Sequence, residues 1–365
     1  MFDYQARRQR LLRLIAEKSA TAVLVTDEVN VRYFSGFSGD SSYLLLSEDR
    51  QFIISDSRYD TQIANECPDL ELVTRTAAQE MKTLVGETIR QLGRQPIAIE
   101  SDSITKAGFD AIAAEVPGVA FLDTTGLGVS LRAIKDAAEI GIIRRSIQIA
   151  EAAFVQLCGE LKPEWSEQQA AYRLEEIIRH LGGQGRAFDT IVAGDQRAAL
   201  PHAGATSHSI GSAATVLFDW GAKYRNYCSD LTRVVVTGKP SANLEKIHQV
   251  AVEAQQMAIA AIRPGASLKA VDSIARDHIA ASGFGPYFGH GLGHGFGLQI
   301  HESPRLSPLA KDNLEIGMVV TVEPGIYLPS DCGVRIEDDV LVTADGCEVL
   351  SNLPRSLQDN RINFG

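Results

Sequence analysis

The sequence lacks the features that mark several large classes of protein. Its five cysteines are odd in number and form no CxxC pair, which argues against a zinc knuckle or a disulfide framework and favours a reducing compartment. No stretch approaches the ~18 apolar residues that a membrane span needs. The N-terminus has no uninterrupted apolar core, and Asp3 and Glu17 argue against a transit peptide. We therefore expect a cytoplasmic protein with no membrane partner.

Positive charge is also in short supply. Lys and Arg together number 35 against 46 Asp and Glu, so the net charge is −11. This balance argues against nucleic acid or an anionic membrane surface as a partner. The hydrophobic fraction of 45% and the charged fraction of 22% are ordinary for a soluble globular protein.

Three familiar catalytic motifs are absent as well. The glycine-rich run 289–297 does not form GxGxxG, so a dinucleotide site is unsupported. His301 and Glu302 begin no HExxH motif, and Pro304 would not sit inside the helix that this motif requires. No GxSxG is present, so a serine hydrolase would have no nucleophile.

The length of 365 residues suggests two domains. The first third alternates helical and strand patterns and predicts a small α/β unit. We expect helices over 4–18, 61–66, 77–92 and 104–116, with strands over 21–26, 42–46, 51–55, 71–74, 97–100 and 119–122. Because Gly126 and Gly128 break the pattern, we place the boundary near 125–133 and predict domains 1–128 and 129–365.

The pattern of the second domain predicts longer helices that are segregated from a sheet. A helical run extends from about residue 133 to 161, and Pro163 ends it. Further helices are expected over 167–181, 243–262 and 268–281, alternating with strands. Helices segregated from an antiparallel or mixed sheet predict an α+β catalytic domain.

Four acids and one histidine of this domain stand in or beside strand-like segments: Asp219, Asp230, His294, Glu323 and Glu337. Taken alone, each acid could be a turn residue or a strand end. Acids within apolar β segments are costly if buried unpaired, however, and several of them need a shared counter-charge. Two divalent cations would balance four carboxylates and leave room for a bound hydroxide, which favours a two-metal hydrolase.

The histidines divide into two groups. His290, His294 and His301 fall in or just after a glycine-rich run, where backbone can approach a ligand closely. We expect functions for His294, His301 and the pre-turn His202, while both explanations stay open for His290. Surface or core roles are expected for the remaining histidines, which are His180, His208, His248 and His278.

Motif by motif, the sequence resembles the prolidase and aminopeptidase P family, the metal-dependent peptidases with the pita-bread fold, and especially its compact microbial members. The matching segments are 188–193, 201–202, 218–222, 229–233, 291–298, 301–302, 322–327 and 335–338. A weaker match places residues 30–37 on the N-domain loop of the family. One departure is Gly194-Asp195-Gln196-Arg197, where many relatives carry a Ser-Gly-x-Asn-like turn; it affects the nearby substrate pocket and leaves the metal site untouched.

The resemblance implies a pita-bread catalytic domain behind an α/β N-terminal domain, and an Xaa-Pro dipeptidase or aminopeptidase. The substrate would be a dipeptide or peptide with proline in second position. The family pattern assigns Asp219 to one metal, His294 and Glu323 to the other, and Asp230 and Glu337 to both. Mn²⁺ or Co²⁺ suits this oxygen-rich set, with Zn²⁺ or Fe²⁺ as alternatives. A hydroxide bridging the two ions would attack the scissile carbonyl.

The resemblance also implies roles around the metals. Glu323 would shuttle a proton, and His202 and His301 would donate hydrogen bonds to the substrate and the tetrahedral intermediate. Arg335 would orient a ligand carboxylate, unless it forms an ordinary surface ion pair. Further side chains expected to bind substrate or support the ligands are His290, Arg305 and Tyr327, with His301, Tyr327 or Arg305 lining a proline pocket.

Two expectations concern assembly and activity. The cluster of Tyr33, Phe34 and Phe37 is of a kind found more often in a core than at an interface. In relatives of the family, however, this region abuts the partner's active site, so we expect a homodimer. The alternative to an active peptidase is a catalytically inactive metal-binding or scaffold homologue on the same fold; the intact His202 and His301 weigh against it.

Overall fold

The computed structural model describes residues 2–362 and 364. It contains two compact units, Met1–Arg132 and Ala133–Gly365. The sequence placed the division between residues 128 and 129, inside helix α6 (Leu127–Ala133). Each unit is described by itself below.

The first unit is built on a six-stranded mixed sheet with the order β4-β3-β2-β1-β5-β6. Neighbours are antiparallel in β1–β2 and β2–β3, and parallel in β3–β4, β1–β5 and β5–β6. The central strands are buried apolar runs, as expected where helices cover both faces. The strands are β1 (Ala22–Val25), β2 (Tyr43–Ser47), β3 (Gln51–Asp56), β4 (Glu71–Arg75), β5 (Ile97–Ile99) and β6 (Phe121–Asp123). The helices ahead of α6 are α1 (Tyr4–Glu17), α2 (Glu28–Ser35), α3 (Asp60–Glu66), α4 (Met81–Leu92) and α5 (Lys106–Glu115).

Helix α2 corrects one expectation. Residues 30–37 were predicted as a loop, but most of them are helical, because the Asp27 side chain caps the first turn and Gly36 ends the helix at φ 81°. The aromatic side chains of this segment are buried in the unit: Tyr33, Phe34 and Phe37. They therefore offer no exposed aromatic surface to a partner.

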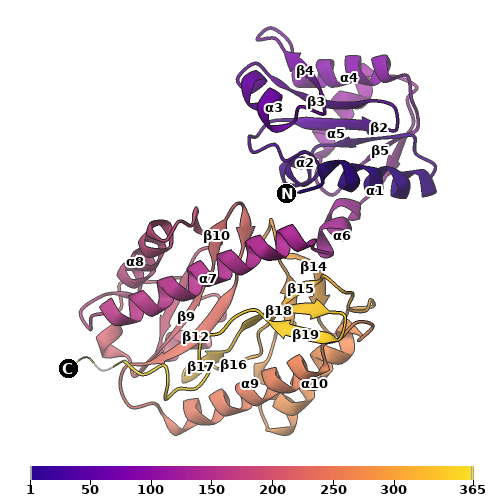
Figure 1. The fold of residues 1–365 in the computed structure, drawn as a ribbon. Helices are drawn as coiled ribbons and strands as arrows, with labels where there is room; N and C mark the ends of the chain where they lie inside the picture. Colours follow the sequence, from indigo (N-terminus) through magenta and orange to yellow (C-terminus); the bar gives the residue numbers. More distant parts are fainter. Residues whose placement is uncertain (1, 363, 365) are drawn as a thin grey trace. The chain divides into compact units, whose positions relative to one another are not determined.

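The second unit contains two layers of helices with strands between them. Helices α7 (Ala137–Glu160) and α8 (Glu167–His180) share one apolar core with strands between residues 191 and 236. Helices α9 (Ala242–Ala261) and α10 (Leu268–Ala281) share another, mainly with strands between residues 302 and 343. Figure 1 shows the two helix pairs on opposite sides of the strands. This arrangement matches the predicted α+β catalytic domain.

The strands of this unit form four sheets with the orders β11-β10-β7, β12-β9-β8, β14-β13-β15-β18-β19 and β16-β17. Their bounds in the first two sheets are β7 (Gly185–Arg186), β8 (Ile191–Gly194), β9 (Thr215–Trp220), β10 (Ala222–Tyr224), β11 (Tyr227–Cys228) and β12 (Leu231–Val236). In the other two they are β13 (Gly293–Gly295), β14 (Glu302–Leu306), β15 (Val319–Val322), β16 (Gly325–Leu328), β17 (Cys332–Arg335), β18 (Asp338–Thr343) and β19 (Gly346–Val349).

The start of α7 also differs from the prediction. The helical run expected from about residue 133 is interrupted, because Ile134 forms a β-bridge with Met318. Helix α7 then begins behind Asp136, which forms a capping box with Glu139.

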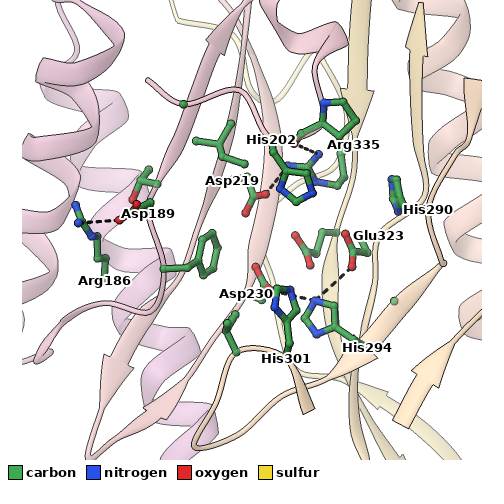
Figure 2. Close-up of a pocket in the computed structure, with 18 of the residues that line it drawn as sticks. Arg186, Asp189, His202, Asp219, Asp230, His290, His294, His301, Glu323 and Arg335 are labelled. Carbon is green, nitrogen blue, oxygen red and sulfur yellow. Dashed lines mark hydrogen bonds and ion pairs between the residues drawn. The ribbon is translucent and has the colours of Figure 1, made fainter. Parts of the chain in front are cut away.

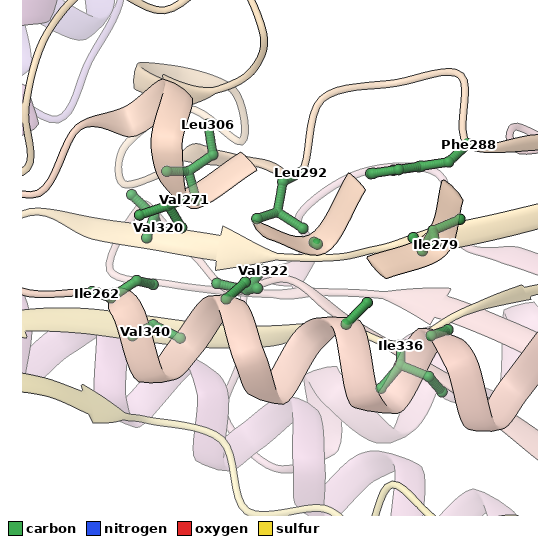
Figure 3. Packing of buried hydrophobic residues seen from close by; sticks show 14 of the residues in the cluster. Ile262, Val271, Ile279, Phe288, Leu292, Leu306, Val320, Val322, Ile336 and Val340 are labelled. Carbon is green, nitrogen blue, oxygen red and sulfur yellow. The ribbon is translucent and has the colours of Figure 1, made fainter. Parts of the chain in front are cut away.

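The apolar core under α9 holds the strands that carry the later predicted ligands. Figure 3 shows Val322, Ile336 and Val340 in this core together with Ile262. Val322 and Ile336 are fully buried, and each directly precedes a predicted glutamate ligand. No helix within residues 2–362 and 364 is long and apolar enough to cross a membrane.

Candidate metal centre

The strands bring the five predicted ligands together from distant parts of the sequence. Asp219 lies in β9, Asp230 directly precedes β12, and His294 lies in β13. Glu323 follows β15, and Glu337 lies between β17 and β18. All five line a single cavity of about 920 Å³. Figure 2 shows Asp219, Asp230, His294 and Glu323 directed into the same space.

The ring of His294 faces carboxylates with its proton-free nitrogen. Its Nδ1 lies 3.1 Å from the carbonyl oxygen of Gly295, which places the ring proton on Nδ1. Its Nε2 lies 3.5 Å from Asp230 Oδ2 and 3.4 Å from Glu323 Oε1. Asp230, His294 and Glu337 each offer one ligand atom, all within 4.8 Å of one another. These acceptor atoms repel one another, and a cation between them would be attracted to each.

Burial keeps His294 from carrying a positive charge and disfavours the ionised forms of the neighbouring acids. Burial lowers the pKa of His294 to about 3, so the imidazole is neutral at ordinary pH. Burial, reinforced by neighbouring carboxylates, raises the pKa of Asp230 and of Glu337 well above the usual range. Burial also raises the pKa of Glu323 to about 7. Ionising these acids together therefore requires further positive charge in the cavity.

Asp219 supplies a further sign that the residues fit a metal. One carboxylate oxygen, Oδ2, accepts a hydrogen bond from Arg335, whereas Oδ1 is buried without any hydrogen-bond partner. An orphaned buried carboxylate oxygen is rare unless it serves a ligand. Four carboxylates and one imidazole suit hard to borderline divalent ions. The donor set thus fits the divalent cations expected from the sequence.

Arg335 joins several residues of the site. It is 4% exposed, so it does not form the surface ion pair that was the alternative to a role in the site. Its guanidinium donates to Asp219, to the Tyr327 hydroxyl at 2.8 Å and to Thr232 Oγ1 at 3.2 Å. The Thr232 hydroxyl in turn donates to Glu337 Oε2 at 2.6 Å. The Arg335 guanidinium thereby orients two of the predicted ligands: Asp219 directly, and Glu337 through Thr232.

His290 and Tyr327 form the other end of this network. His290 Nδ1 lies 2.8 Å from the Gly291 carbonyl oxygen, and its Nε2 lies 3.0 Å from the Tyr327 hydroxyl. Burial lowers the pKa of His290 to about 4 and raises the pKa of Tyr327 to about 12. Both side chains are therefore neutral, and the tyrosine donates to His290 while it accepts from Arg335.

The remaining predicted residues line the open part of the cavity: His202, His301 and Arg305. The ring of His301 meets that of His294 edge-on, with 4.5 Å between the centroids. Burial lowers the pKa of His301, with the nearby Arg305 as a second cause. Arg305 lies directly across β13–β14 from His294. Every residue that the sequence singled out for the site thus lines this cavity.

Arg305 differs from the other arginines of the cavity. Arg186 pairs with Asp189 at 2.7 Å (Figure 2), and Arg335 pairs with Asp219. Among the described residues that line the cavity, Arg305 is the arginine without a hydrogen bond or ion pair. The cavity therefore holds one cation free to meet an anion from outside.

Glu167, which the sequence did not point to, anchors the loop that carries His202. Its carboxylate accepts from the backbone N–H of Gly194 at 2.9 Å, from the N–H and hydroxyl of Thr206 at 2.9 and 2.6 Å, and from Arg197 Nε at 3.1 Å. Arg197 belongs to the segment 194–197, which was expected to differ from the turn found in many relatives of the family. This segment holds the His202 loop by an ion pair.

Comparisons with known proteins agree with this geometry. Residues 141–344 match metallopeptidase family M24, and residues 7–134 match the creatinase/prolidase N-terminal domain. The chain is 38% identical to an uncharacterized peptidase of Bacillus subtilis over 96% of this chain and 98% of that protein. It is 35% identical to the Xaa-Pro dipeptidase of Pyrococcus furiosus over 96% of this chain and 99% of that one.

Solved structures show the same relationship. The Xaa-Pro dipeptidase from Bacillus anthracis superimposes with a TM-score of 0.94 at 37% identity, covering 97% of this chain and 99% of that one. The X-Pro aminopeptidase from Thermotoga maritima gives a TM-score of 0.89 at 36% identity, covering 98% and 99%. The predicted family and fold are confirmed. With both of its units matched, the chain belongs to metallopeptidase family M24 and carries a creatinase/prolidase N-terminal domain.

Proposed function

We propose that the chain hydrolyses the Xaa–Pro bond of short substrates that begin with a free amino terminus and carry proline in second position. The observation that supports it most directly is the convergence of the His294 Nε2 and carboxylate oxygens in a cavity also lined by His202, His301 and Arg305. The names of the relatives, Xaa-Pro dipeptidase and X-Pro aminopeptidase, point to the same reaction.

Two divalent ions would be held by the five ligands: Asp219, Asp230, His294, Glu323 and Glu337. Mn²⁺ or Co²⁺ is the proposed pair, with Zn²⁺ or Fe²⁺ as the alternatives. When bound, such ions lower the pKa of water and polarise a carbonyl group. His294 already has the neutral form that a metal ligand needs. Bound cations would also favour the ionised forms of the acids, which burial alone disfavours.

Proton movement falls to Glu323. Its carboxylate faces the space in which the predicted ligands converge, with Oε1 3.4 Å from His294 Nε2, and a carboxylate in that place can act as a general base and acid. It would take the proton of the attacking water and deliver it to the proline nitrogen, which leaves as a secondary amine. His202 and His301 would donate hydrogen bonds to the oxygen of the scissile carbonyl as negative charge develops there.

Arg305 would select dipeptides over longer peptides. A proline dipeptide ends in a free carboxylate, and an unpaired guanidinium across the strand pair from His294 is suited to bind it. The proline ring, whose nitrogen offers no N–H to grip, would lie between this residue, His301 and Tyr327. We therefore favour a dipeptidase over an aminopeptidase acting on long peptides.

The first experiment compares Ala-Pro, Ala-Pro-Ala and N-acetylated Ala-Pro with added Mn²⁺. We expect Ala-Pro to be cleaved with the highest kcat/KM and the acetylated dipeptide to resist cleavage. Faster cleavage of Ala-Pro-Ala would reverse the preference for dipeptides, and rapid cleavage of the blocked peptide would refute the requirement for a free amino terminus. A metal-loaded protein that cleaves none of the three would favour the inactive homologue.

The second experiment tests Arg305 against a matched arginine of the same cavity. Arg305→Met should raise KM for Ala-Pro while changing kcat/KM for Ala-Pro-amide little, because the amide has no carboxylate to bind. Arg186→Met, whose arginine is already paired with Asp189, should leave the ratio of the two substrates unchanged. Equal effects of Arg305→Met on both substrates would remove the carboxylate-binding role.

A homodimer and a cytoplasmic location stay predictions. The aromatic cluster behind the dimer expectation is buried within the first unit, so the dimer now depends on the family resemblance, and light scattering would test it. All five cysteines are free thiols.

A further inference from the structure

A buried glutamine contacts the backbone of both strands that carry the predicted glutamate ligands. Gln255 lies on α9 and is completely buried. Its amide nitrogen Nε2 lies 3.0 Å from the carbonyl oxygen of Val322 and 3.2 Å from that of Ile336. These residues are the immediate predecessors of Glu323 and Glu337. One amide group, with its two N–H donors, thus bridges the two backbone positions from which the ligands project.

The surroundings of Gln255 are otherwise apolar. Its neighbours on the same face of α9 are alanines of the core, Ala251, Ala254 and Ala258, and all three are fully buried. Figure 3 shows the Val322 and Ile336 side chains in the apolar core to which this face contributes. The amide oxygen of Gln255 is buried and has no hydrogen-bond partner. An apolar residue would avoid that unsatisfied oxygen, so core packing alone does not explain a glutamine at this position.

The two contacted carbonyls lie where regular strand pairing ends. Val322 is the last residue of β15, and Ile336 lies between β17 and β18. Glu323 also donates its backbone N–H to Leu292 at 2.8 Å, and Glu337 donates its N–H to Thr232 at 3.3 Å. The Gln255 bridge therefore fixes the spacing of two backbone segments that leave their sheets at the site.

We propose that Gln255 is a positioning residue that sets the distance between Glu323 and Glu337 and so tunes the affinity of the centre for divalent metal. The inference rests on the proposed function, because it concerns the same metal centre. Loss of a group that orients metal ligands typically weakens metal binding roughly 10–100-fold. The N–H donors of Gln255 act through the ligand backbone and touch neither substrate nor metal.

The test measures metal binding by the folded protein and needs no catalysis. Gln255→Met keeps the length of the side chain and removes both N–H donors. We expect its affinity for Co²⁺, measured by calorimetry and by the visible absorption of the bound ion, to fall roughly 10–100-fold, with an altered spectrum. Gln256→Met, an exposed glutamine on the same helix, should bind Co²⁺ as the unmodified protein does.

A destabilised core variant separates positioning from general stability. Leu244→Ala removes a buried contact in the same core and should lower the melting temperature without changing the Co²⁺ affinity or spectrum. If Gln255→Met does not fold, Gln255→Asn keeps an amide that is too short to reach both carbonyls, and the same loss of affinity is expected.

Each outcome bears on a stated claim. Unchanged Co²⁺ affinity and spectrum in a folded Gln255 variant overturn the positioning role, while the unmodified protein still binds metal and cleaves Ala-Pro. Equal losses of affinity in Gln255→Met and Leu244→Ala would also overturn it. If the unmodified protein binds no divalent ion and cleaves nothing, the proposed function itself fails.

Discussion

Replacing Glu167 by alanine should both destabilise the catalytic unit and slow the reaction. The Glu167 side chain is 2% exposed and its partner Arg197 is 25% exposed, so the pair is only partly screened by solvent. Breaking a buried ion pair costs about 3–5 kcal/mol of unfolding free energy. The partial exposure of Arg197 places the ion pair's share of the loss near the lower limit, at about 3 kcal/mol. The lost hydrogen bonds from Gly194 and Thr206 add to it.

Replacing the partner, Arg197, by alanine should lower the unfolding free energy less. In Arg197→Ala, Glu167 still accepts hydrogen bonds from the backbone N–H groups of Gly194 and Thr206. Hydrogen bonds to a charged group contribute about 1.5–3 kcal/mol each, so Glu167→Ala should be the more damaging of the two. Urea unfolding of the metal-free protein would measure both losses, with the exposed Glu164→Ala as a control.

Glu167→Ala should also lower kcat, because Glu167 anchors the loop that carries His202. His202 lies between Arg197 and Thr206, so losing Glu167 loosens the loop on both sides of the histidine. Two hydrogen bonds to the loop remain, from Arg335 to the Pro201 carbonyl oxygen at 3.2 Å and from Arg197 to that of Gly204 at 2.6 Å. Displacing a catalytic group by about 1 Å can cost roughly 10²-fold in rate, and we expect kcat to fall 10–100-fold by this reasoning with metal content unchanged. A Glu167→Ala protein as stable and as active as Glu164→Ala would refute the anchoring role.

Three further outcomes are expected. His202→Ala and His301→Ala should lower kcat by roughly 10²–10³-fold, the scale of one lost transition-state hydrogen bond; a metal analysis showing an emptied centre would instead make either residue a ligand. Removing metal with a chelator should lower the melting temperature, since a ligand at a hundredfold excess over Kd adds about 2.7 kcal/mol; an unchanged melting curve would contradict this. For the metal-free protein, urea unfolding at pH 5 and pH 7 should show lower stability at pH 7. Folding raises the pKa of Glu323 from 4.5 to about 7 and also raises the pKa of Asp230 and Glu337. Between pH 5 and pH 7 the folded state therefore keeps protons that the unfolded state has already released, and its stability falls as the pH rises. The lowered pKa values of His290 and His294 act in the opposite direction, but only until the unfolded histidines lose their protons near pH 6.5. Bound metal should abolish this slope, and a metal-free protein that gains stability over the same range would contradict the reasoning.

The sequence pointed to the candidate metal ligands because acids in apolar strands conflict with their surroundings. Glu323 and Glu337 adjoin runs that burial would otherwise fill with apolar side chains, and a shared cation would resolve the conflict. Most helices and strands followed from hydrophobic periodicity, with ends displaced by a few residues. The sequence did not predict the interruption before α7, because the apolar pattern continues through Ile134. Asp136 and Glu139 nevertheless have the spacing of a capping box, which marks the start of a helix.

Helix α2 was missed for a different reason. Its eight residues are too few to show a clear helical period, and its aromatic residues do not favour a helix. The caps at both ends, Asp27 and Gly36, were nevertheless visible in the sequence. Their correct assignment would have placed Tyr33 and Phe34 on a packed helix face and removed the argument for an exposed interface.

Gln255, Glu167 and Thr232 could not be predicted from the sequence because they act through contacts between distant segments. Gln255 binds two backbone carbonyls, and Glu167 binds two backbone N–H groups, which carry no residue-specific signal. What the sequence does show is a polar residue on an otherwise apolar helix face: Gln255 stands among alanines of the α9 core. Burying such a group costs free energy unless it is bonded, so a lone amide on a core face indicates a backbone contact worth locating. In this fold the backbone that it meets is the one that carries Glu323 and Glu337.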